Sequence, residues 1–177
     1  MINGDYRRYR DGVLRESGIY AKGKRNSTFT EYYQDGVTPR KETPMQQGKI
    51  DGTVKTYFRN GKIEIEKEYK QSVENGRERR FANKTGKQIF ESHYIDGKKD
   101  GEEWEIFEDA STLRSRIIRH YRNGKLDGSY RVESTRDGKP YITIEGQYTD
   151  GEKSGQWIEH NYDNNTQTCT WHGEGGA

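Results

Sequence analysis

Apolar and polar side chains alternate over short stretches of this chain. Between residues 63 and 69, isoleucine, lysine and tyrosine hold the odd-numbered positions, and glutamate holds the even-numbered ones. The pattern returns at Ile142, Ile144 and Tyr148. A period of two places successive side chains on opposite faces of a β-strand. With only three leucines, four alanines and no sustained spacing of three and four, the pattern predicts strands and few helices.

A longer period is superimposed on this alternation. The phrase Tyr-x-x-Gly-Lys-x-x-Gly begins at Tyr94, at Tyr121 and, with glutamate in the lysine position, at Tyr148. Weaker copies lie near residues 20, 47 and 69, and the last position of the phrase advances in steps of 24 to 27 residues. These last positions are Asn26, Gly52, Gly76, Gly101, Gly128 and Gly155. Such a period indicates a repeat array, in which each unit packs on its neighbours.

Each unit also contains a second glycine, about ten residues after the phrase. It follows Asp or Asn in several copies, and its positions are Gly12, Gly36, Gly61, Gly86 and Gly138. Asn-Gly and Asp-Gly pairs favour tight hairpin turns, because these residues tolerate positive φ. Each unit is therefore predicted to contain two strands and two turns.

The array is predicted to fill the chain as a single domain, 1–177. A half unit at 3–19 is followed by units of about 24 to 27 residues at 20–45, 46–68, 69–93, 94–120, 121–147 and 148–168, with a tail at 169–177. Aromatic residues lie two or three positions beyond the phrase glycine, at Trp104, Tyr130 and Trp157.

Three segments depart from the pattern. The stretch from Phe107 to Ser115 replaces the usual Asn-Gly and is predicted to form a longer turn. The first phrase glycine is missing near Val73, and residues 38–45 contain Pro39 and Pro44. A bulge, a sheet edge or a deformed contact region would each account for these departures.

The amino-acid composition indicates a thin hydrophobic core. Leu, Ile, Val and Phe total only 26 of 177 residues, whereas 13 tyrosines and 3 tryptophans are present, so aromatic stripes are expected to stabilise the hairpins. The net charge of +2 gives no bulk attraction to polyanions, and nucleic acid is not expected as a partner. Local basic groups at residues 77–80 and at residues 114–122 could contribute to a partner surface.

Candidate chemistry is sparse. His93 and His120 each precede the repeated tyrosine, so they are predicted to be recurrent structural histidines and not ligands of a shared metal. The glutamates at 64, 66 and 68 and at 102, 103, 105 and 108 are expected to form outward sheet faces, where little shields a general acid. No catalytic residue, metal site or cofactor is predicted.

The single cysteine, Cys169, rules out an internal disulfide and leaves the redox compartment open. No apolar run reaches membrane-spanning length, and the first residues contain no signal-peptide hydrophobic region. We therefore expect a cytoplasmic protein, with a periplasmic or surface location open if an upstream signal was removed.

The segments YIDGKKDGEEWEIFE, YRNGKLDGSYRVE and YTDGEKSGQWIEH resemble the bacterial variant of the MORN repeat, and YFRNGKIEIEKEY resembles the other half of that unit. The resemblance extends from about Asn3 to Asp163. It implies an all-β fold in which tandem β-hairpins form one elongated, twisted antiparallel sheet. Bacterial proteins of this kind are grouped with YwqK-like antitoxins, which implies neutralisation of a partner toxin by direct binding.

The leading hypothesis is a non-enzymatic protein-binding module, an antitoxin or immunity protein. Aromatic residues and arginine dominate binding energy where they are exposed. The predicted partner-binding residues are accordingly Arg79, Trp104, Arg119, Tyr130 and Trp157. The alternative is a structural or surface-associated scaffold that self-associates through its edge strands or contacts a membrane, and lipid binding is the weaker inference because the chain has no basic excess. If Trp104 and Trp157 pack within the sheet instead, truncating them would unfold the protein.

Overall fold

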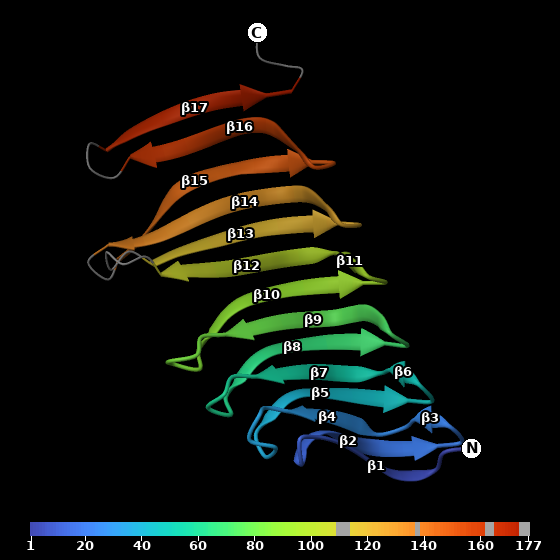
Figure 1. Cartoon of the computed structure of the whole chain (residues 1–177). Coiled ribbons are helices and arrows are strands. Elements are labelled where there is room, and N and C mark those ends of the chain that lie inside the picture. Colours follow the sequence, from blue (N-terminus) through green and yellow to red (C-terminus); the bar gives the residue numbers. More distant parts are fainter. Residues whose placement is uncertain (109–113, 137–138, 162–164, 174–177) are drawn as a thin grey trace. The chain divides into compact units, whose positions relative to one another are not determined.

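A computed structural model describes the chain except for residues 109–113, 137–138, 162–164 and 174–177. The described residues form β-strands joined by turns and contain no helix (Figure 1). Hydrogen bonding assigns the 17 strands to an antiparallel sheet. The predicted fold class, an all-β antiparallel sheet of tandem hairpins, is confirmed. The chain divides into two compact units, Met1–Gln88 and Ile89–Ala177, which are described separately.

The first unit is a meander of hairpins, in which each long strand pairs with the next long strand along the chain. Its strands are β1 (Gly4–Arg10), β2 (Val13–Ala21), β3 (Lys24–Arg25), β4 (Thr28–Tyr32), β5 (Pro39–Gln46), β6 (Lys49–Ile50), β7 (Gly52–Tyr57), β8 (Ile63–Lys70) and β9 (Val73–Phe81).

The second unit follows the same plan. Its strands are β10 (Gln88–Ile95), β11 (Lys98–Lys99), β12 (Gly101–Glu108), β13 (Arg114–Arg122), β14 (Lys125–Arg136), β15 (Lys139–Thr149), β16 (Glu152–Asn161) and β17 (Thr166–His172). Phe107 and Ser115, expected in a longer turn, pair across β12 and β13. Residues 109–113 between these strands lie outside the described residues, as does the expected turn at Gly138.

The turns of the repeated phrase have two consecutive residues with positive φ, as a type I′ hairpin turn requires. Asn123 and Gly124 are representative, with φ of 51° and 86°. Where the phrase glycine is missing, Gln71 and Ser72 adopt the same conformation with φ of 51° and 70°. The hairpin therefore forms without glycine at this turn. The proline-containing segment forms strand β5, and its pairing with β4 is irregular: Glu31 pairs with Lys41 and Tyr32 with Pro39, so the register skips Arg40 of β5, as it would at a bulge.

Successive phrase turns are joined by a ladder of hydrogen bonds. The backbone N–H of Gly124 donates to the Lys99 carbonyl over 2.8 Å, and the N–H of Asn123 donates to Asp100 Oδ2 over 3.0 Å. The same pair of bonds recurs at the turns that contain Lys22, Gln47, Gln71 and Asp150, with Asn3, Asn26, Asp51 and Asp127 as the side-chain acceptors. We call this set of bonds the turn ladder. Its side-chain acceptor is the residue before the last glycine of the phrase, a position that the sequence pattern treats as variable. The ladder also places Asn26 in this acceptor position, one residue before the last position of the phrase, to which the sequence pattern assigned it.

A row of buried side chains lies two positions beyond the second phrase glycine, and Phe90 of β10, 3% exposed, is buried outside this row. In the first unit, Val54 is 9% exposed, and Phe29, which follows Asn26 by three positions, is 1% exposed. The Phe29 ring packs edge-on against Tyr20 at 5.4 Å and against the backbone of Gly18. In the second unit, Trp157 is 4% exposed and packs against Gly146 in the same manner. A buried ring thus faces a glycine on the neighbouring strand.

Trp157 completes an aromatic cluster with Tyr130 and Tyr148. The ring centroids of Tyr130 and Tyr148 lie 5.4 Å and 5.2 Å from that of Trp157. The indole N–H donates to the Gln147 carbonyl over 3.1 Å, so the polar atom of the buried side chain is satisfied. A β-carbon at Gly146 would lie 2.3 Å from the Trp157 ring. Only glycine fits opposite this indole.

We expect Gly146→Ala to lower the free energy of unfolding by about 2 kcal/mol, because the added methyl group overpacks the core. Urea unfolding of the variant, of Trp157→Val and of the double variant forms a double-mutant cycle. In the Trp157→Val background the alanine should cost less than about 0.5 kcal/mol, the scale of independent substitutions. A Gly146→Ala protein as stable as the parent would show that the ring does not pack on this backbone.

The turn ladder leads to a second prediction. Asp100→Ala should lower the free energy of unfolding by about 1 kcal/mol, because the Asn123 N–H loses its side-chain acceptor. Asp100→Asn should be nearly neutral, since asparagine fills the equivalent positions 3 and 26. Thermal and urea unfolding of both variants measure the effect. Equal destabilisation by alanine and asparagine would argue against a hydrogen-bonding role.

Candidate protein-binding site

Two carboxylates occupy core positions that hold aromatic rings elsewhere in the array. Glu78 in β9 is 3% exposed and Glu103 in β12 is 0% exposed. The expectation of an outward glutamate face is therefore wrong for Glu103. Neighbouring residues of a strand point to opposite faces, so Glu102 and Glu103 cannot both point outward. Glu103, two positions after Gly101, lies on the buried face together with the less buried Glu105, and Glu102 is exposed.

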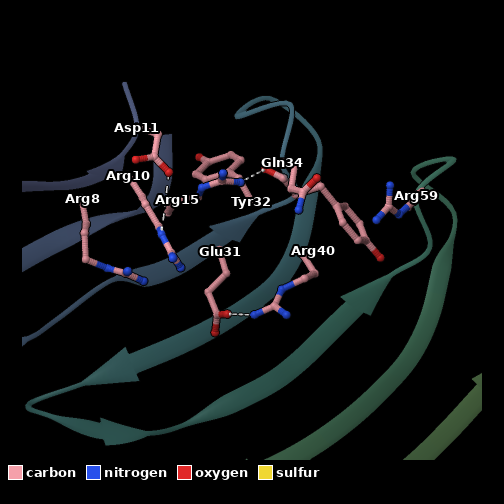
Figure 2. A pocket seen from close by; sticks show the side chains of 10 residues that line it. Arg8, Arg10, Asp11, Arg15, Glu31, Tyr32, Gln34, Arg40 and Arg59 are labelled. Atoms are coloured by element: carbon pink, nitrogen blue, oxygen red, sulfur yellow. Dashed lines mark hydrogen bonds and ion pairs between the residues drawn. The ribbon is translucent and has the colours of Figure 1, made fainter. Parts of the chain in front are cut away.

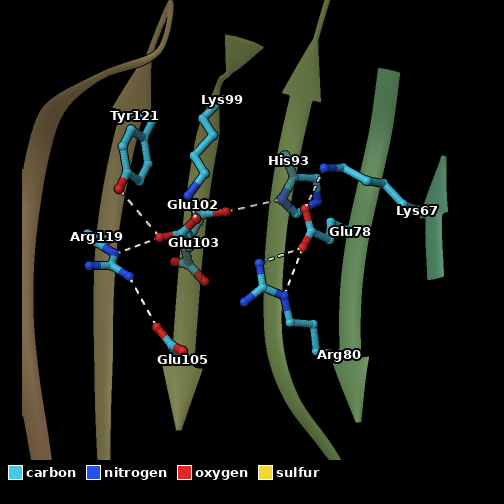
Figure 3. Close-up of polar contacts among 10 residues, drawn as sticks. All are labelled: Lys67, Glu78, Arg80, His93, Lys99, Glu102, Glu103, Glu105, Arg119 and Tyr121. Carbon is cyan, nitrogen blue, oxygen red and sulfur yellow. Dashed lines mark hydrogen bonds and ion pairs between the residues drawn. The ribbon is translucent and has the colours of Figure 1, made fainter. Parts of the chain in front are cut away.

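Each buried carboxylate is surrounded by cations within its own unit (Figure 3). Glu103 forms an ion pair with Lys99, accepts a 2.6 Å bond from Arg119 Nε and lies 3.4 Å from the Tyr121 hydroxyl, which donates to it. Glu78 accepts from Lys67 Nζ at 2.9 Å and from Arg80 Nη2 at 2.7 Å. At these two core positions, ion pairs take the place of the aromatic packing found in other repeats.

These contacts keep both carboxyl groups ionised. Burial alone would raise the pKa of Glu103, but the hydrogen bond and positive charge of Lys99 and the charge of Arg119 outweigh it, so the pKa is lowered. Burial opposes ionisation of Glu78 as well, and the bonds from Lys67 and Arg80 again lower the pKa. A general acid at neutral pH needs a raised pKa. The arrangement is that of a structural ion pair.

Three of the five predicted partner-binding residues belong to packed clusters of the second unit. Trp157 and Tyr130 form the aromatic cluster, and burial raises the pKa of the Tyr130 hydroxyl. Arg119 bridges Glu103 and Glu105, with 25% of its side chain exposed. These side chains have defined structural roles, and partner binding by them stays a prediction.

The other two lie on the opposite face of their strands from the buried glutamates. Trp104 follows Glu103 directly, and Arg116 lies over its ring at 5.0 Å from the centroid. Arg79, in the first unit, follows Glu78, and its Nη2 lies 2.9 Å from Glu66 Oε2. Trp104 lies three positions after its phrase glycine, whereas Tyr130 and Trp157 lie two positions after theirs. Because side chains alternate between the two faces of a strand, Trp104 lies on the opposite face of the sheet from Tyr130 and Trp157.

The recurrent histidines make equivalent backbone contacts. His93 Nδ1 lies 3.1 Å from the Glu102 carbonyl oxygen, and His120 Nδ1 lies 3.3 Å from the Ser129 carbonyl oxygen. Within the described part of the chain, no group of three or more histidine, cysteine or acidic side chains is arranged to hold a metal ion. Cys169 is an exposed free thiol.

A groove in the first unit brings together residues that the sequence analysis did not connect (Figure 2). Its volume is about 590 Å³. It is lined by Arg8, Arg10, Asp11, Arg15, Glu31, Tyr32, Tyr33, Gln34, Arg40 and Arg59. We call it the arginine groove. Five arginines against two acids give it a formal charge of +3, whereas the whole chain carries +2.

Strand ends and loops of three successive hairpins supply this groove. Arg10 ends β1, Gln34 lies in the connection between β4 and β5, and Arg59 lies in the connection between β7 and β8. Arg10 and Arg59 each precede an Asp-Gly or Asn-Gly turn. Equivalent turns of a meander lie next to one another at the same ends of the strands. The position of Arg10 and Arg59 directly before such turns is therefore the signal in the sequence that could have identified these two residues as neighbours.

Internal contacts fix the walls of the groove. Arg40 forms an ion pair with Glu31, and Arg15 Nη1 donates to the Tyr33 carbonyl over 3.2 Å. The Tyr33 hydroxyl donates to the Tyr57 carbonyl, and the Tyr32 hydroxyl lies 3.0 Å from Ser17 Oγ. These contacts within the protein hold the two tyrosine rings in place.

No model of a known protein family matches the chain, and no curated protein matches it. The part of the chain that the structure describes contains no helix with the length and apolar character needed to cross a membrane.

The buried carboxylates predict a pH dependence of stability. The folded-state pKa values of Glu78 and Glu103 lie below the ordinary 4.5, so the stabilisation is complete above about pH 4.5 and is lost as the pH falls through the folded values. Glu103→Gln should reduce the slope of unfolding free energy against pH in this acidic range. At neutral pH it should cost about 2 kcal/mol, less than for a fully buried pair, because Lys99 and Arg119 remain partly exposed.

Urea unfolding at a series of pH values measures both effects. The matched control is Glu102→Gln, which removes the neighbouring carboxylate on the same strand, where 49% of the side chain is exposed. An unchanged pH slope in Glu103→Gln, or the same loss in both variants, would contradict the role assigned to Glu103.

Proposed function

We propose that the chain is a non-enzymatic protein-binding module whose working surface is the arginine groove. The observation that carries this proposal is the convergence of arginine and tyrosine side chains from three successive hairpins in one open groove. Arginine and tyrosine are enriched among the residues that dominate protein interfaces. The tyrosine rings are already ordered, which reduces the entropy lost on binding.

The polar chemistry of the strands supports a role in binding and not in catalysis. The most buried carboxylate, Glu103, is neutralised by Lys99 and Arg119 and has a lowered pKa. A carboxyl group in this state is a poor proton donor at neutral pH. Its contribution is to packing between neighbouring strands.

The finer proposal is that this module is an antitoxin or immunity protein that neutralises a cognate toxin by direct contact. Support comes from the resemblance of the repeated segments to the bacterial MORN variant and to YwqK-like antitoxins. A repeat array of hairpins offers an extended surface that needs no cofactor. Arg79, Trp104, Arg119, Tyr130 and Trp157 remain predicted contact residues, and the exposed groove arginines are the first to test, because replacing them removes little packing.

The test is to purify the tagged chain from its native cells, identify any stoichiometric partner by mass spectrometry and measure binding of the purified partner by calorimetry. The product of the neighbouring gene is the first candidate for co-expression. We expect a complex that Arg10→Glu/Arg59→Glu weakens by about tenfold, which corresponds to about 1.4 kcal/mol. Rescue of cell growth by the chain, when the partner is toxic, tests the antitoxin proposal separately.

The control is Arg7→Glu/Lys84→Glu, which changes the net charge equally at positions that do not line the groove. The control should bind like the parent protein. If the chain is recovered free of any stoichiometric partner, or if the purified candidate does not bind, the proposed function is wrong.

A further inference from the structure

The arginine groove has more positive charge than its own acids can neutralise. Arg10 has 78% of its side chain exposed, and its Nε lies 3.8 Å from Oδ2 of Asp11, which is 86% exposed. Arg40 and Arg8, paired with Glu31 and Glu16, still have 56% and 54% of their side chains exposed. The Arg10–Asp11 pair is exposed on both sides and is therefore weak. Glu16 is buried, but more than half of the Arg8 and Arg40 side chains remains accessible, so these guanidinium groups are open to a second anion.

Arg59 is the most available of these cations. Its guanidinium carbon lies 5.5 Å from the centroid of the Tyr33 ring, and among the described residues it forms no ion pair. Hydrogen bonds from Thr38 and Val37 lower the pKa of the exposed Asp35 carboxyl, and the charge of Arg59 contributes less to the same shift. A guanidinium resting on an aromatic ring is held in position while its hydrogen-bond donors stay free. Arg59 is therefore preorganised for a planar acceptor such as a carboxylate.

The spacing of the arginines suggests the size of the ligand. Arg10 and Arg59 flank turns two hairpins apart, and Figure 2 shows them on opposite sides of Gln34. Strands about 4.8 Å apart place such turns roughly 20 Å from each other. An extended peptide rises about 3.3 Å per residue, so about six residues would connect them.

The two acidic residues in the groove favour an acidic peptide over a nucleic acid as the ligand. Asp11 and Glu31 lie among the arginines, so positive charge does not run without interruption along the groove. A nucleic acid presents phosphates at a constant interval, some of which would meet these carboxylates. Separate carboxylates on a peptide can contact the arginines and avoid the acids, and the pair of Arg40 with Glu31 already shows a guanidinium of this groove holding a carboxylate.

We infer that the arginine groove binds an extended acidic segment of a protein, about six residues long, whose carboxylates contact Arg10 and Arg59. This inference rests on the proposed protein-binding function and specifies the chemistry of the partner. Tyr32, Tyr33 and Gln34 form the wall between the two cationic ends. Electrostatic complementarity then determines which segments bind.

The test is fluorescence anisotropy with two labelled peptides about eight residues long, one with glutamates at every second or third position and one with glutamine in their place. We expect the glutamate peptide to bind at low salt, at least tenfold more tightly than the glutamine peptide, and to weaken as salt is added. Arg10→Glu/Arg59→Glu should reduce its affinity at least tenfold. Arg7→Glu/Lys84→Glu should change the affinity less than twofold, although the two variants have the same net charge.

Arg59→Lys separates guanidinium recognition from simple charge. It should weaken the glutamate peptide about threefold, because lysine cannot form the paired hydrogen bonds to a carboxylate. Circular dichroism and thermal unfolding confirm that each variant is folded. Equal affinity for the two peptides, or equal loss in the groove and control variants, would overturn the inference.

Competition experiments address the other anionic partners. A single-stranded oligonucleotide of equal charge, or vesicles containing phosphatidylserine, that bind more tightly than the glutamate peptide and displace it would overturn the inference. The two proposals fail differently. A native partner that binds Arg10→Glu/Arg59→Glu as tightly as the parent removes the acidic-segment inference and leaves protein binding intact. A chain that binds the glutamate peptide but has no partner in cells removes the proposed function.

Discussion

The bonds between successive phrase turns organise this protein. A single hairpin is marginal in water, and its tight turn leaves backbone groups unpaired. In the turn ladder, the N–H groups of one turn donate to a carbonyl and to an Asp or Asn side chain of the preceding repeat. The bonds join residues about twenty positions apart, so within each unit these contacts align a hairpin with the one before it. The core side chains then meet in register.

Because the repeats are aligned in register, the same core position can hold either an aromatic ring or a carboxylate. Phe29 and Trp157 bury rings against glycine, whereas Glu78 and Glu103 bury carboxylates against lysine and arginine. The ring pairs contribute apolar burial, and the ion pairs depend on every charge retaining its partner. Stability in the charged repeats is therefore sensitive to acid and to loss of one partner, while the aromatic repeats are sensitive to added volume.

Much of the fold could be predicted because its determinants are local. Positive φ at Asn123 and Gly124 follows from the residues themselves, and alternation identifies strands such as β8. The burial of Glu103 could not be predicted in this way, because alternation sorts side chains into two faces without showing which face is covered. The arginine groove depends on Arg10, Gln34 and Arg59, which become neighbours only when three hairpins are in register. The sequence shows that Arg10 and Arg59 precede turns, but it does not show that their side chains line the same groove.

The glycines opposite the Phe29 and Trp157 rings have a consequence for how such an array changes over generations. Gly18 belongs to the strand before Phe29, and Gly146 to the strand before Trp157, so the two halves of each fit are encoded in adjacent repeats. A recombination event that exchanged one whole repeat would bring a foreign ring against a side chain such as Lys67 and separate the matched halves. The heritable module of this architecture therefore runs from the second strand of one hairpin to the first strand of the next.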